Sequence, residues 1–350
     1  MFRLFQGLIK TIVLIMTMVT NILASDFNIP KTDLDIISHV TNKLYDTTLD
    51  HITIEPIQKG FSGDRLYLVK YKDNLIIRIY KNNKSLEDKK VEVLCAVKAY
   101  DLGFGPKILY KSADLNVIAT EFIEGDHPNI TTFLNHNLLD SIACNLKKLH
   151  NDSFVNREWS VFDYIKNDVP QIIDNKTKLA LEQLHKIQSS LHKANFPKKL
   201  CHNDIHSKNL FVYNDQILLI DWGDSGMSDP FWDLARVSME FGFDSKQDER
   251  FLTQYLDKVS DLDRSRFYLM KQVFLLRTAL VLNILRIDFS KTQIQDIIKI
   301  FEVNNYPLNI NNKSINWSDV SHHAMELFLN NCKTDLFRKS LNMIEAESKK

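Results

Sequence analysis

A short polar loop followed by a hairpin constrains this chain more than any other feature of its sequence. The loop begins at His202, contains Asp204, and runs into the apolar stretches LFVY and ILLI, which are separated by a turn at Asn214–Asp215. Apolar, β-branched runs around a short polar turn predict a β-hairpin. Asn209 opens this hairpin and Asp221 closes it, so strand pairing would bring their side chains together. We therefore expect a cluster of carboxylate and amide oxygens around one cation.

Such a cluster suits phosphoryl transfer. The reaction requires a carboxylate near the attacking hydroxyl and oxygen ligands that hold Mg²⁺ against the phosphates of ATP. Asp204 is placed for the first task, and Asn209 and Asp221 are placed for the second. A single HxD triplet is common by chance, whereas the whole ordered set is rare. The sequence therefore predicts Asp204 as the catalytic residue and a magnesium site at Asn209 and Asp221.

The apolar pattern before residue 125 indicates a β-rich region. Five apolar runs between residues 50 and 123 have the composition of strands: ITIEPI, RLYLVKY, LIIRIY, KILY and VIATEFI. One helix interrupts them at residues 85–101, with Ser85 as its N-cap. We expect residues 26–124 to form an N-terminal lobe made of a β-sheet and one helix.

Helical periodicity dominates the remainder of the chain. Residues 131–151 and 174–194 are amphipathic, and Phe267–Leu285 is apolar almost all round, which indicates a buried helix. Residues 125–350 are therefore expected to form a larger, mainly helical lobe that contains the hairpin. The expected fold class is α+β.

Composition argues against several classes of protein. Lysine plus arginine and aspartate plus glutamate number 44 each, so no basic field points to nucleic acid. The four cysteines are scattered without a CxxC pair, so we expect neither a zinc site nor a disulfide framework. A reducing compartment is the simplest interpretation.

Residues 1–25 stand apart from the rest of the chain. Arg3 and Lys10 precede an uncharged run, Thr11–Ser25, that resembles a secretory signal with a small residue at Ala24. The run is short for a membrane span, which needs about 20 apolar residues. A cleaved signal, a membrane anchor and a start codon set too far upstream all remain open. Membrane contact is expected only through this segment, and the need for ATP favours the cytoplasm.

The polar motifs resemble those of a known superfamily. The pattern HxDxxxxN at residues 202–209, followed by Ile220–Asp221, resembles the phosphotransferase branch of the protein-kinase superfamily, which includes aminoglycoside, choline and ethanolamine kinases. The segment DPFWDLA at residues 229–235 is similar to the DP..DLA box of that branch. The resemblance covers about residues 55–290. It implies a bilobal protein-kinase-like fold, a small-molecule kinase, and ATP and Mg²⁺ as cofactors.

The resemblance also implies nucleotide-binding residues. Gly60, Ser62 and Gly63 lie between the first two strands, where small residues let backbone N–H groups approach phosphates. Arg78 stands where the superfamily uses a basic residue to hold phosphates, and Glu92 is its expected partner, with Glu87 as runner-up. The stretch TEFI resembles the hinge, where backbone groups from Glu121 to Ile123 would bind adenine.

One further stretch bears on the acceptor. Glu240 and Phe241 stand where choline and ethanolamine kinases place a glutamate and an aromatic residue toward the substrate ammonium. A carboxylate beside an aromatic face attracts an amine through charge and cation–π contact. His206 and Asp204 are expected on the same side. The chain departs from the family pattern because Leu275–Arg286 contains no Trp or Tyr to complete an aromatic cage.

The acceptor is therefore expected to be a small amino-alcohol such as choline or ethanolamine. A larger amino-alcohol, thiamine or an aminoglycoside is the alternative within the same fold. A non-catalytic pseudokinase that acts as a binding module is the alternative from another class, and the intact Asp204, Asn209 and Asp221 argue against it.

Overall fold

The computed structural model describes residues 29–57, 63–81, 83–134, 136–152, 155–169, 173–284 and 317–349. The hydrophobic segment 1–25 and the predicted phosphate-loop residues Gly60 and Ser62 lie outside these ranges. Contacts group the chain into two compact units. The sheet unit contains the described residues up to His127 together with Lys208–Asp224, and the helical unit contains Pro128–Ser207 and the chain from Ser225 onward.

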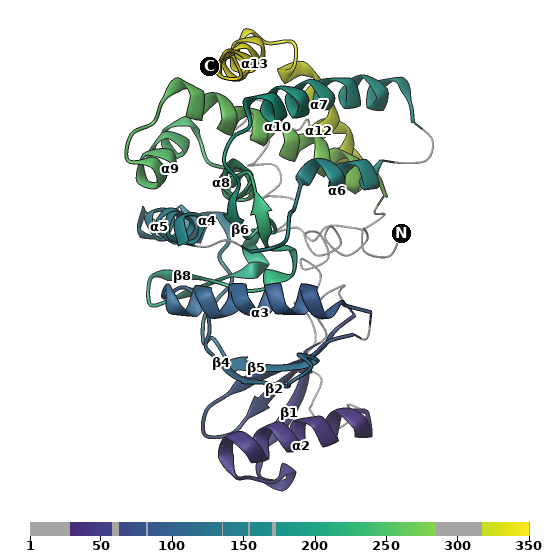
Figure 1. The fold of residues 1–350 in the computed structure, drawn as a ribbon, viewed down its shortest axis with the longest axis vertical. Coiled ribbons are helices and arrows are strands. Elements are labelled where there is room, and N and C mark those ends of the chain that lie inside the picture. Colours follow the sequence, from purple (N-terminus) through teal and green to yellow (C-terminus); the bar gives the residue numbers. More distant parts are fainter. Residues whose placement is uncertain are drawn as a thin grey trace, which may run out of the picture. The chain divides into compact units, whose positions relative to one another are not determined.

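A five-stranded antiparallel sheet forms the centre of the sheet unit (Figure 1). Its strands lie in the order β1-β2-β3-β5-β4. Their bounds are β1 Thr53–Ile57, β2 Arg65–Lys70, β3 Leu75–Ile79, β4 Ile108–Lys111 and β5 Val117–Glu121. Each strand falls within one of the five apolar runs expected from the sequence, apart from one residue at the end of β4.

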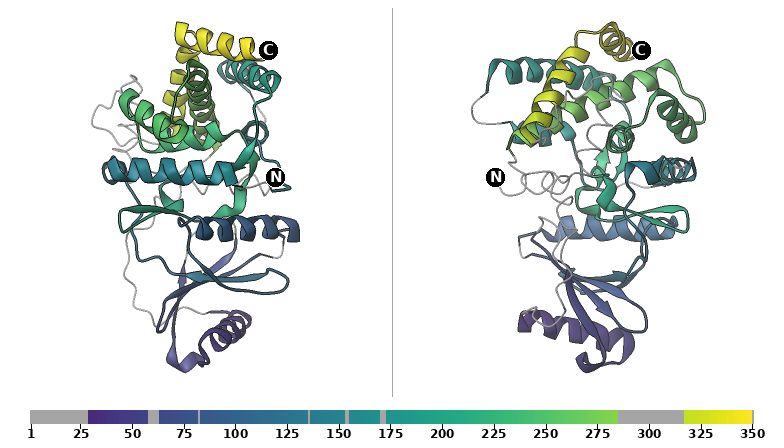
Figure 2. Two further views of the ribbon diagram at one scale, coloured as in Figure 1. Left: turned by 60° about the vertical axis from the view of Figure 1, so that its left-hand side comes forward. Right: turned by 180° about the vertical axis from the view of Figure 1, so that it is seen from behind.

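Two helices, α2 (Lys31–Tyr45) and α3 (Leu86–Asp101), lie on opposite faces of this sheet (Figures 1 and 2). On the α2 side, Ile37 and Val40 share a core with Val69 and Ile77. Because side chains alternate along a strand, Arg78 points to the other face, toward α3. Ser85 caps α3 as expected, since its hydroxyl accepts a hydrogen bond from the Asp88 N–H.

Helix α2 is an addition to the expected single helix of this region. A buried carboxylate fixes it to the sheet: Asp33, 1% exposed, accepts hydrogen bonds from Arg65 Nε at 2.6 Å and Tyr67 Oη at 2.5 Å. Both partners lie on β2, so the helix is docked by a polar contact as well as by the apolar core.

The predicted hairpin is present and belongs to the sheet unit. Its strands are β7 (Leu210–Tyr213) and β8 (Gln216–Leu219), and both turn residues between them have positive φ, as a tight hairpin turn requires. Leu219 N donates to Phe104 O at 2.7 Å, and Val212 N donates to Asp126 O at 2.8 Å. A Cβ added to Gly125 would lie 2.4 Å from Val212 O, so the strand approaches this close because residue 125 is glycine.

The helical unit is built around α10 (Asp261–Ile284), the helix expected to be buried. Helices α8, α12 and α13 pack against it. The other elements are α4 Ile130–Phe133, α5 His136–Asp152, α6 Val161–Asp168, α7 Asn175–Ala194, β6 Lys199–Cys201, β9 Gly226–Ser228, α8 Pro230–Glu240, α9 Ser245–Leu256, α12 Trp317–Asn331 and α13 Asp335–Glu347. Among the described helices, none combines the length and apolar character needed to cross a membrane. The expected α+β class is confirmed.

Candidate active site

Helix α8 holds the polar loop that precedes the hairpin. The helix begins at Pro230, and the Asp229 side chain caps it by accepting a hydrogen bond from Phe231 N at 2.9 Å. One turn further on, the Asp233 carboxylate accepts hydrogen bonds from His202 N at 2.7 Å and Asn203 N at 2.8 Å. The two buried backbone N–H groups at the start of the loop are thereby paired with one carboxylate.

Successive turns of α8 contact successive residues of the loop. Arg236 Nε donates to Ile205 O at 2.7 Å, and Arg236 Nη2 lies 3.3 Å from Asp204 Oδ1. Glu240 Oε1 accepts a hydrogen bond from Ser207 N at 3.0 Å. Because residues three or four apart share one face of a helix, a single face of α8 positions the loop along its whole length.

Asp204, the predicted catalytic residue, is therefore held in a fixed environment. It is 2% exposed, and His206 Nε2 lies 3.6 Å from its Oδ2 atom. The preceding residue, Asn203, has φ of 67°, a conformation that asparagine tolerates better than most side chains. The carboxylate thus has a histidine on one side and the guanidinium of Arg236 on the other.

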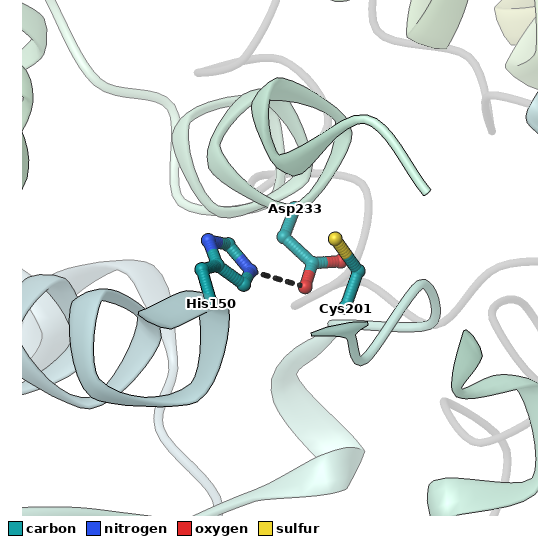
Figure 3. Close-up of side chains that lie close together, drawn as sticks. All are labelled: His150, Cys201 and Asp233. Atoms are coloured by element: carbon teal, nitrogen blue, oxygen red, sulfur yellow. Dashed lines mark hydrogen bonds and ion pairs between the residues drawn. The ribbon is translucent and has the colours of Figure 1, made fainter. Parts of the chain in front are cut away.

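A buried cluster of His150, Cys201 and Asp233 supports the loop from behind (Figure 3). His150 Nε2 lies 3.2 Å from Asp233 Oδ2, and its other ring nitrogen lies 2.8 Å from Tyr255 Oη. The ligand atoms of the three residues lie within 4.8 Å of one another, a spacing that suits a metal ion. Both Asp233 oxygens already accept backbone hydrogen bonds, and burial raises the pKa of the Cys201 thiol, so we interpret the cluster as a structural support.

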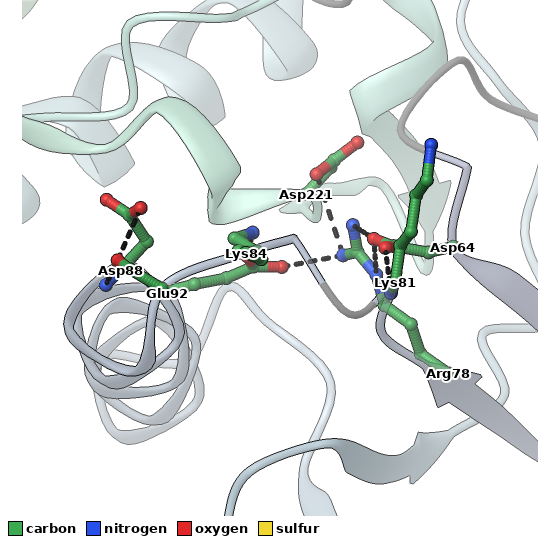
Figure 4. Close-up of polar contacts among 8 residues, drawn as sticks. Asp64, Arg78, Lys81, Lys84, Asp88, Glu92 and Asp221 are labelled. Carbon is green, nitrogen blue, oxygen red and sulfur yellow. Dashed lines mark hydrogen bonds and ion pairs between the residues drawn. The ribbon is translucent and has the colours of Figure 1, made fainter. Parts of the chain in front are cut away.

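The sheet unit carries the second set of predicted residues, centred on Arg78 (Figure 4). Arg78 Nη1 donates to Glu92 Oε1 at 2.6 Å, so Glu92 rather than Glu87 is the partner. Arg78 Nη2 and Nε donate to Asp64 Oδ2 at 2.7 and 2.9 Å. Asp64 directly follows Gly63, and its other oxygen accepts from Lys81 N at 2.9 Å. Asp64 therefore ties the end of the glycine-containing loop to β3 and the residues after it.

Asp221 and Asn209 lie in the same unit. Ile220 N donates to Asn209 O at 3.0 Å, so the hairpin holds the ends of β7 and β8 together as the sequence predicts. Asp221 has φ of 61°, and its Oδ1 atom lies 3.7 Å from Arg78 Nη1. Arg78, Glu92 and Asp221, which are far apart in the sequence, thus form one charged cluster.

The charges in this cluster stabilise one another. Burial disfavours the charged form of Arg78, but the carboxylates of Glu92, Asp221 and Asp64 outweigh it and raise the pKa of Arg78. Burial likewise disfavours ionised Glu92, but Arg78 and Lys84 hold its pKa below the ordinary value. Lys84 forms an ion pair with Glu92 Oε2.

Tyr80 supports the cations of the cluster from one side. The Arg78 guanidinium lies 4.9 Å and the Lys84 ammonium 5.0 Å from the centre of the Tyr80 ring. Burial, followed by the negative charge of Glu92, raises the pKa of Tyr80, so this ring stays neutral beside the two cations. The arrangement of Arg78 and Lys84 therefore depends on an aromatic residue that sequence motifs do not mark.

The remaining predicted nucleotide-binding residues lie at the ends of strands, Gly63 just before β2 and Glu121 to Ile123 at and after the end of β5. Gly63 has φ of 72°, and a Cβ there would lie 3.0 Å from the Lys81 side chain, so glycine is needed at this position. The backbone N–H of Glu121 donates to Lys107 O, and that of Phe122 donates to Asn74 O. Ile123 is half-buried just beyond the end of β5.

The acceptor-side residues differ in accessibility. Glu240 is half-buried, and one of its oxygens binds the loop at Ser207 N. Phe241 is 1% exposed and stacks on Phe133, with ring centres 3.7 Å apart. His206 is 1% exposed beside Asp204. The structure therefore gives Phe241 a place in the core, and its contact with substrate stays a prediction.

Besides Tyr80 and Lys84, sequence motifs do not mark Asp64, Arg236 and His150 as contributors to these clusters. Asp64 directly follows Gly63, and that place is a usable signal. Arg236 follows directly after the DLA box, and His150 ends an amphipathic helix. Each pairs with a residue distant in the sequence, so spacing alone could not identify its partner.

Comparison with known proteins agrees with this geometry. The family described as the phosphotransferase enzyme family matches residues 53–268. Protein LicA of Haemophilus influenzae is 26% identical over 194 residues, which span 53% of this chain and 72% of LicA. The expectation of a phosphotransferase, here with similarity to LicA, is confirmed.

Solved structures show the same fold at low identity. The match to a choline/ethanolamine kinase family protein from Mesorhizobium loti covers 89% of this chain and 99% of that protein's chain, with 19% identity and a TM-score of 0.65. The match to the choline kinase LicA from Streptococcus pneumoniae covers 79% of this chain and 100% of the LicA chain, with 20% identity and a TM-score of 0.57. A LicA structure in complex with AMP matches with a TM-score of 0.55. Because the family match extends over more than half of its length, this chain belongs to the phosphotransferase enzyme family.

Proposed function

We propose that this protein is an ATP- and Mg²⁺-dependent kinase that phosphorylates the hydroxyl of a small amine-bearing alcohol such as choline or ethanolamine. The observation that carries the proposal is the cluster of Arg78, Glu92 and Asp221, in which a cation for phosphates lies beside a carboxylate suited to a metal ion. Similarity to LicA, one structure of which contains AMP, supports an adenine nucleotide as the donor.

The nucleotide would be held by the sheet unit. Arg78 contacts its phosphates while Glu92 and Asp64 fix the guanidinium from two sides. The glycine-containing loop, of which Gly63 is described, supplies backbone N–H groups to the same phosphates. The N–H groups of Glu121 and Phe122 are already hydrogen-bonded within the sheet, so adenine recognition falls to the backbone from Glu121 O to Ile123.

The residues present fit a magnesium ion. Mg²⁺ prefers oxygen ligands, and Asp221 offers a carboxylate and Asn209 an amide oxygen at neighbouring ends of one hairpin. Arg78 Nη1 lies 3.7 Å from Asp221 Oδ1, so the same cluster would bring the metal ligand and the phosphate-binding cation together. When bound, Mg²⁺ neutralises charge that develops on the phosphates during transfer. Asp221 and Asn209 would hold it.

The acceptor would be bound by the helical unit. Asp204 accepts a hydrogen bond from the attacking hydroxyl and takes its proton. Glu240 uses Oε1 for Ser207 N, so its second oxygen is assigned to the ammonium group of the acceptor. His206 limits the space beside Asp204. Phe241 follows Glu240 and stacks on Phe133, and its contact with the acceptor stays a prediction.

A screen of phosphate transfer tests the proposal. Purified protein with Mg²⁺ and γ-labelled ATP is offered choline, ethanolamine, thiamine and an aminoglycoside, with Asp204→Asn and Asp221→Asn as inactive variants. We expect label transfer to choline or ethanolamine that both variants abolish. Transfer only to the aminoglycoside or thiamine would show that the protein is a kinase with a different acceptor from the one proposed. Nucleotide binding without transfer to any alcohol would instead favour a binding module.

A further inference from the structure

Arg236 is buried in a place where an arginine is costly. It is 0% exposed, and within the described part of the chain its Nη1 atom has no hydrogen-bond partner. Leaving a buried donor without an acceptor destabilises a folded protein. Burial also lowers the pKa of Arg236, although the opposing charge of Asp204 raises it. The side chain is therefore placed there at a cost to stability, which calls for a functional explanation.

Both hydrogen bonds that Arg236 donates within the described residues go to the loop that carries Asp204. Its Nε binds Ile205 O at 2.7 Å, while Nη2 lies 3.3 Å from Asp204 Oδ1. The guanidinium packs over the Trp232 ring at 5.7 Å, and Trp232 Nε1 in turn donates to Asn203 O at 3.0 Å. Arg236 thus holds Ile205 and the Asp204 carboxylate directly, and it packs on the tryptophan that holds Asn203.

We propose that Arg236 is a positioning residue for the reaction: it fixes the Asp204 carboxylate in one orientation and keeps it ionised, so that Oδ2 faces the acceptor hydroxyl. The proposal rests on the proposed kinase function, in which Asp204 acts on that hydroxyl. A planar guanidinium that binds a backbone carbonyl and a carboxylate at once defines both position and charge, which a lysine cannot reproduce.

Other titratable groups lie near Asp204 and Arg236 and act on the charges of this pair. His206 faces Asp204 Oδ2 at 3.6 Å from the same loop. Arg236 itself interacts electrostatically with Arg277 on α10 and with Asp233 and Glu240 on α8. Arg236 Nη2 lies 3.3 Å from Asp204 Oδ1, so removal of Arg236 takes a positive charge away from this carboxylate. Losing a nearby positive charge makes a carboxylate easier to protonate.

The first experiment needs no substrate. A double-mutant cycle with Arg236→Gln and Asp204→Asn compares urea unfolding of the wild type, both single variants and the double variant at pH 7. We expect each single change to destabilise the protein and the double change to destabilise it by clearly less than their sum. Additive effects would show that the two side chains do not interact, and would overturn the proposal whether or not the protein is a kinase.

The second experiment follows turnover against pH for Arg236→Gln and Arg236→Lys. Arg266→Gln is the matched control, because Arg266 is also buried and binds the α8 cap at Asp229, 2.9 Å away. For Arg236→Gln we expect kcat at pH 7 to fall about 10- to 100-fold, with the KM for ATP almost unchanged. In the plot of kcat against pH, the acidic limb, where activity falls as the pH is lowered, should move up by about one pH unit.

Arg236→Lys should return the acidic limb toward its wild-type position while kcat stays reduced, because charge is restored without the bond to Ile205 O. Arg266→Gln should leave the limb in place. If Arg236→Gln and Arg266→Gln give the same pH profile, Arg236 is merely structural. Absence of turnover in the wild type would instead count against the proposed function and leave the unfolding cycle as the deciding test.

Discussion

Arg78 donates hydrogen bonds to carboxylates on two sides. Substitutions of Arg78 can therefore distinguish the effect of its positive charge from the effect of its hydrogen-bonding geometry. Arg78→Ala should lower kcat/KM for ATP by about two orders of magnitude, because a cation for the phosphates is lost. Arg78→Lys should recover about a tenth of the wild-type value, since charge returns without the bidentate fork. Steady-state kinetics with varied ATP measures both.

Arg65→Ala provides the control for that comparison. Arg65 lies on β2 of the same sheet and also pairs with a buried carboxylate, Asp33, at 2.6 Å. Its loss should reduce stability without changing the KM for ATP. Equal kinetic effects of Arg65→Ala and Arg78→Ala would show that Arg78 acts only through the fold of the sheet unit.

Glu240 combines two tasks that one substitution can divide. Glu240→Gln keeps an oxygen that accepts from Ser207 N but removes the charge. We therefore expect the KM for choline or ethanolamine to rise by about one to two orders of magnitude, with ATP kinetics and stability unchanged. Glu240→Ala should also lower kcat, because the loop loses its anchor. Wild-type kinetics in Glu240→Gln would remove Glu240 from the acceptor site.

At the scale of elements, α6 and α10 meet through a buried carboxylate with an unusual titration. Burial raises the pKa of Asp168 to about 6 from 3.8, and Arg277, 3.9 Å away, offsets only part of this shift. A raised pKa means that the folded state binds the proton more tightly. The contribution of Asp168 to stability should therefore be full below pH 3.8 and be lost as the pH rises through about 6, by at most about 3 kcal/mol.

Asp168→Asn should remove this dependence. The variant is expected to gain stability over the wild type as the pH rises from 4 to 7, as measured by urea unfolding at each pH. Asp163→Asn on the same helix is the control, because Asp163 is exposed and pairs with Lys166 at 2.9 Å. A constant difference between Asp168→Asn and wild type across this range would contradict the assigned shift.

The strands and α3 followed from the sequence because local signals define them. Alternating apolar residues and the Ser85 cap act within a few residues, and the structure confirms both. Helix α2 was not predicted, although Leu34, Ile37, Thr41 and Leu44 have helical spacing. The pairs that complete the site, such as Asp204 with Arg236, depend on tertiary packing and leave no periodic signal. The roles of the site residues therefore stay predictions, while the fold and family are confirmed.

At the scale of the whole molecule, the two units carry separate parts of the proposed reaction. Asp221 belongs to the sheet unit and Asp204 to the helical unit. We expect Asp204→Asn to keep the rise in Tm that Mg²⁺ and ATP produce together, since a ligand at 100 times its Kd stabilises by about 2.7 kcal/mol. Asp221→Asn should lose the part of that rise that requires Mg²⁺.

Thermal denaturation with ATP, with and without Mg²⁺, gives these values for both variants. Asp215→Asn, an exposed change in the hairpin turn, should behave as wild type. Loss of the nucleotide effect in Asp204→Asn would show that nucleotide binding depends on the helical unit as well.

The hairpin of β7 and β8 makes the sheet unit discontinuous in sequence, because it returns to Phe104 and Asp126 after some 80 residues of the other unit. Recombination between relatives at a single crossover after His127 would therefore join one parent's sheet to the other parent's hairpin. A larger residue at position 125 in one parent would then clash with the hairpin of the other parent, because Val212 O leaves no space for a side chain there. The two segments are expected to be inherited and exchanged together, so chimeras that exchange the helical unit to change acceptor choice need three junctions: one after His127 and one on each side of residues 208–224.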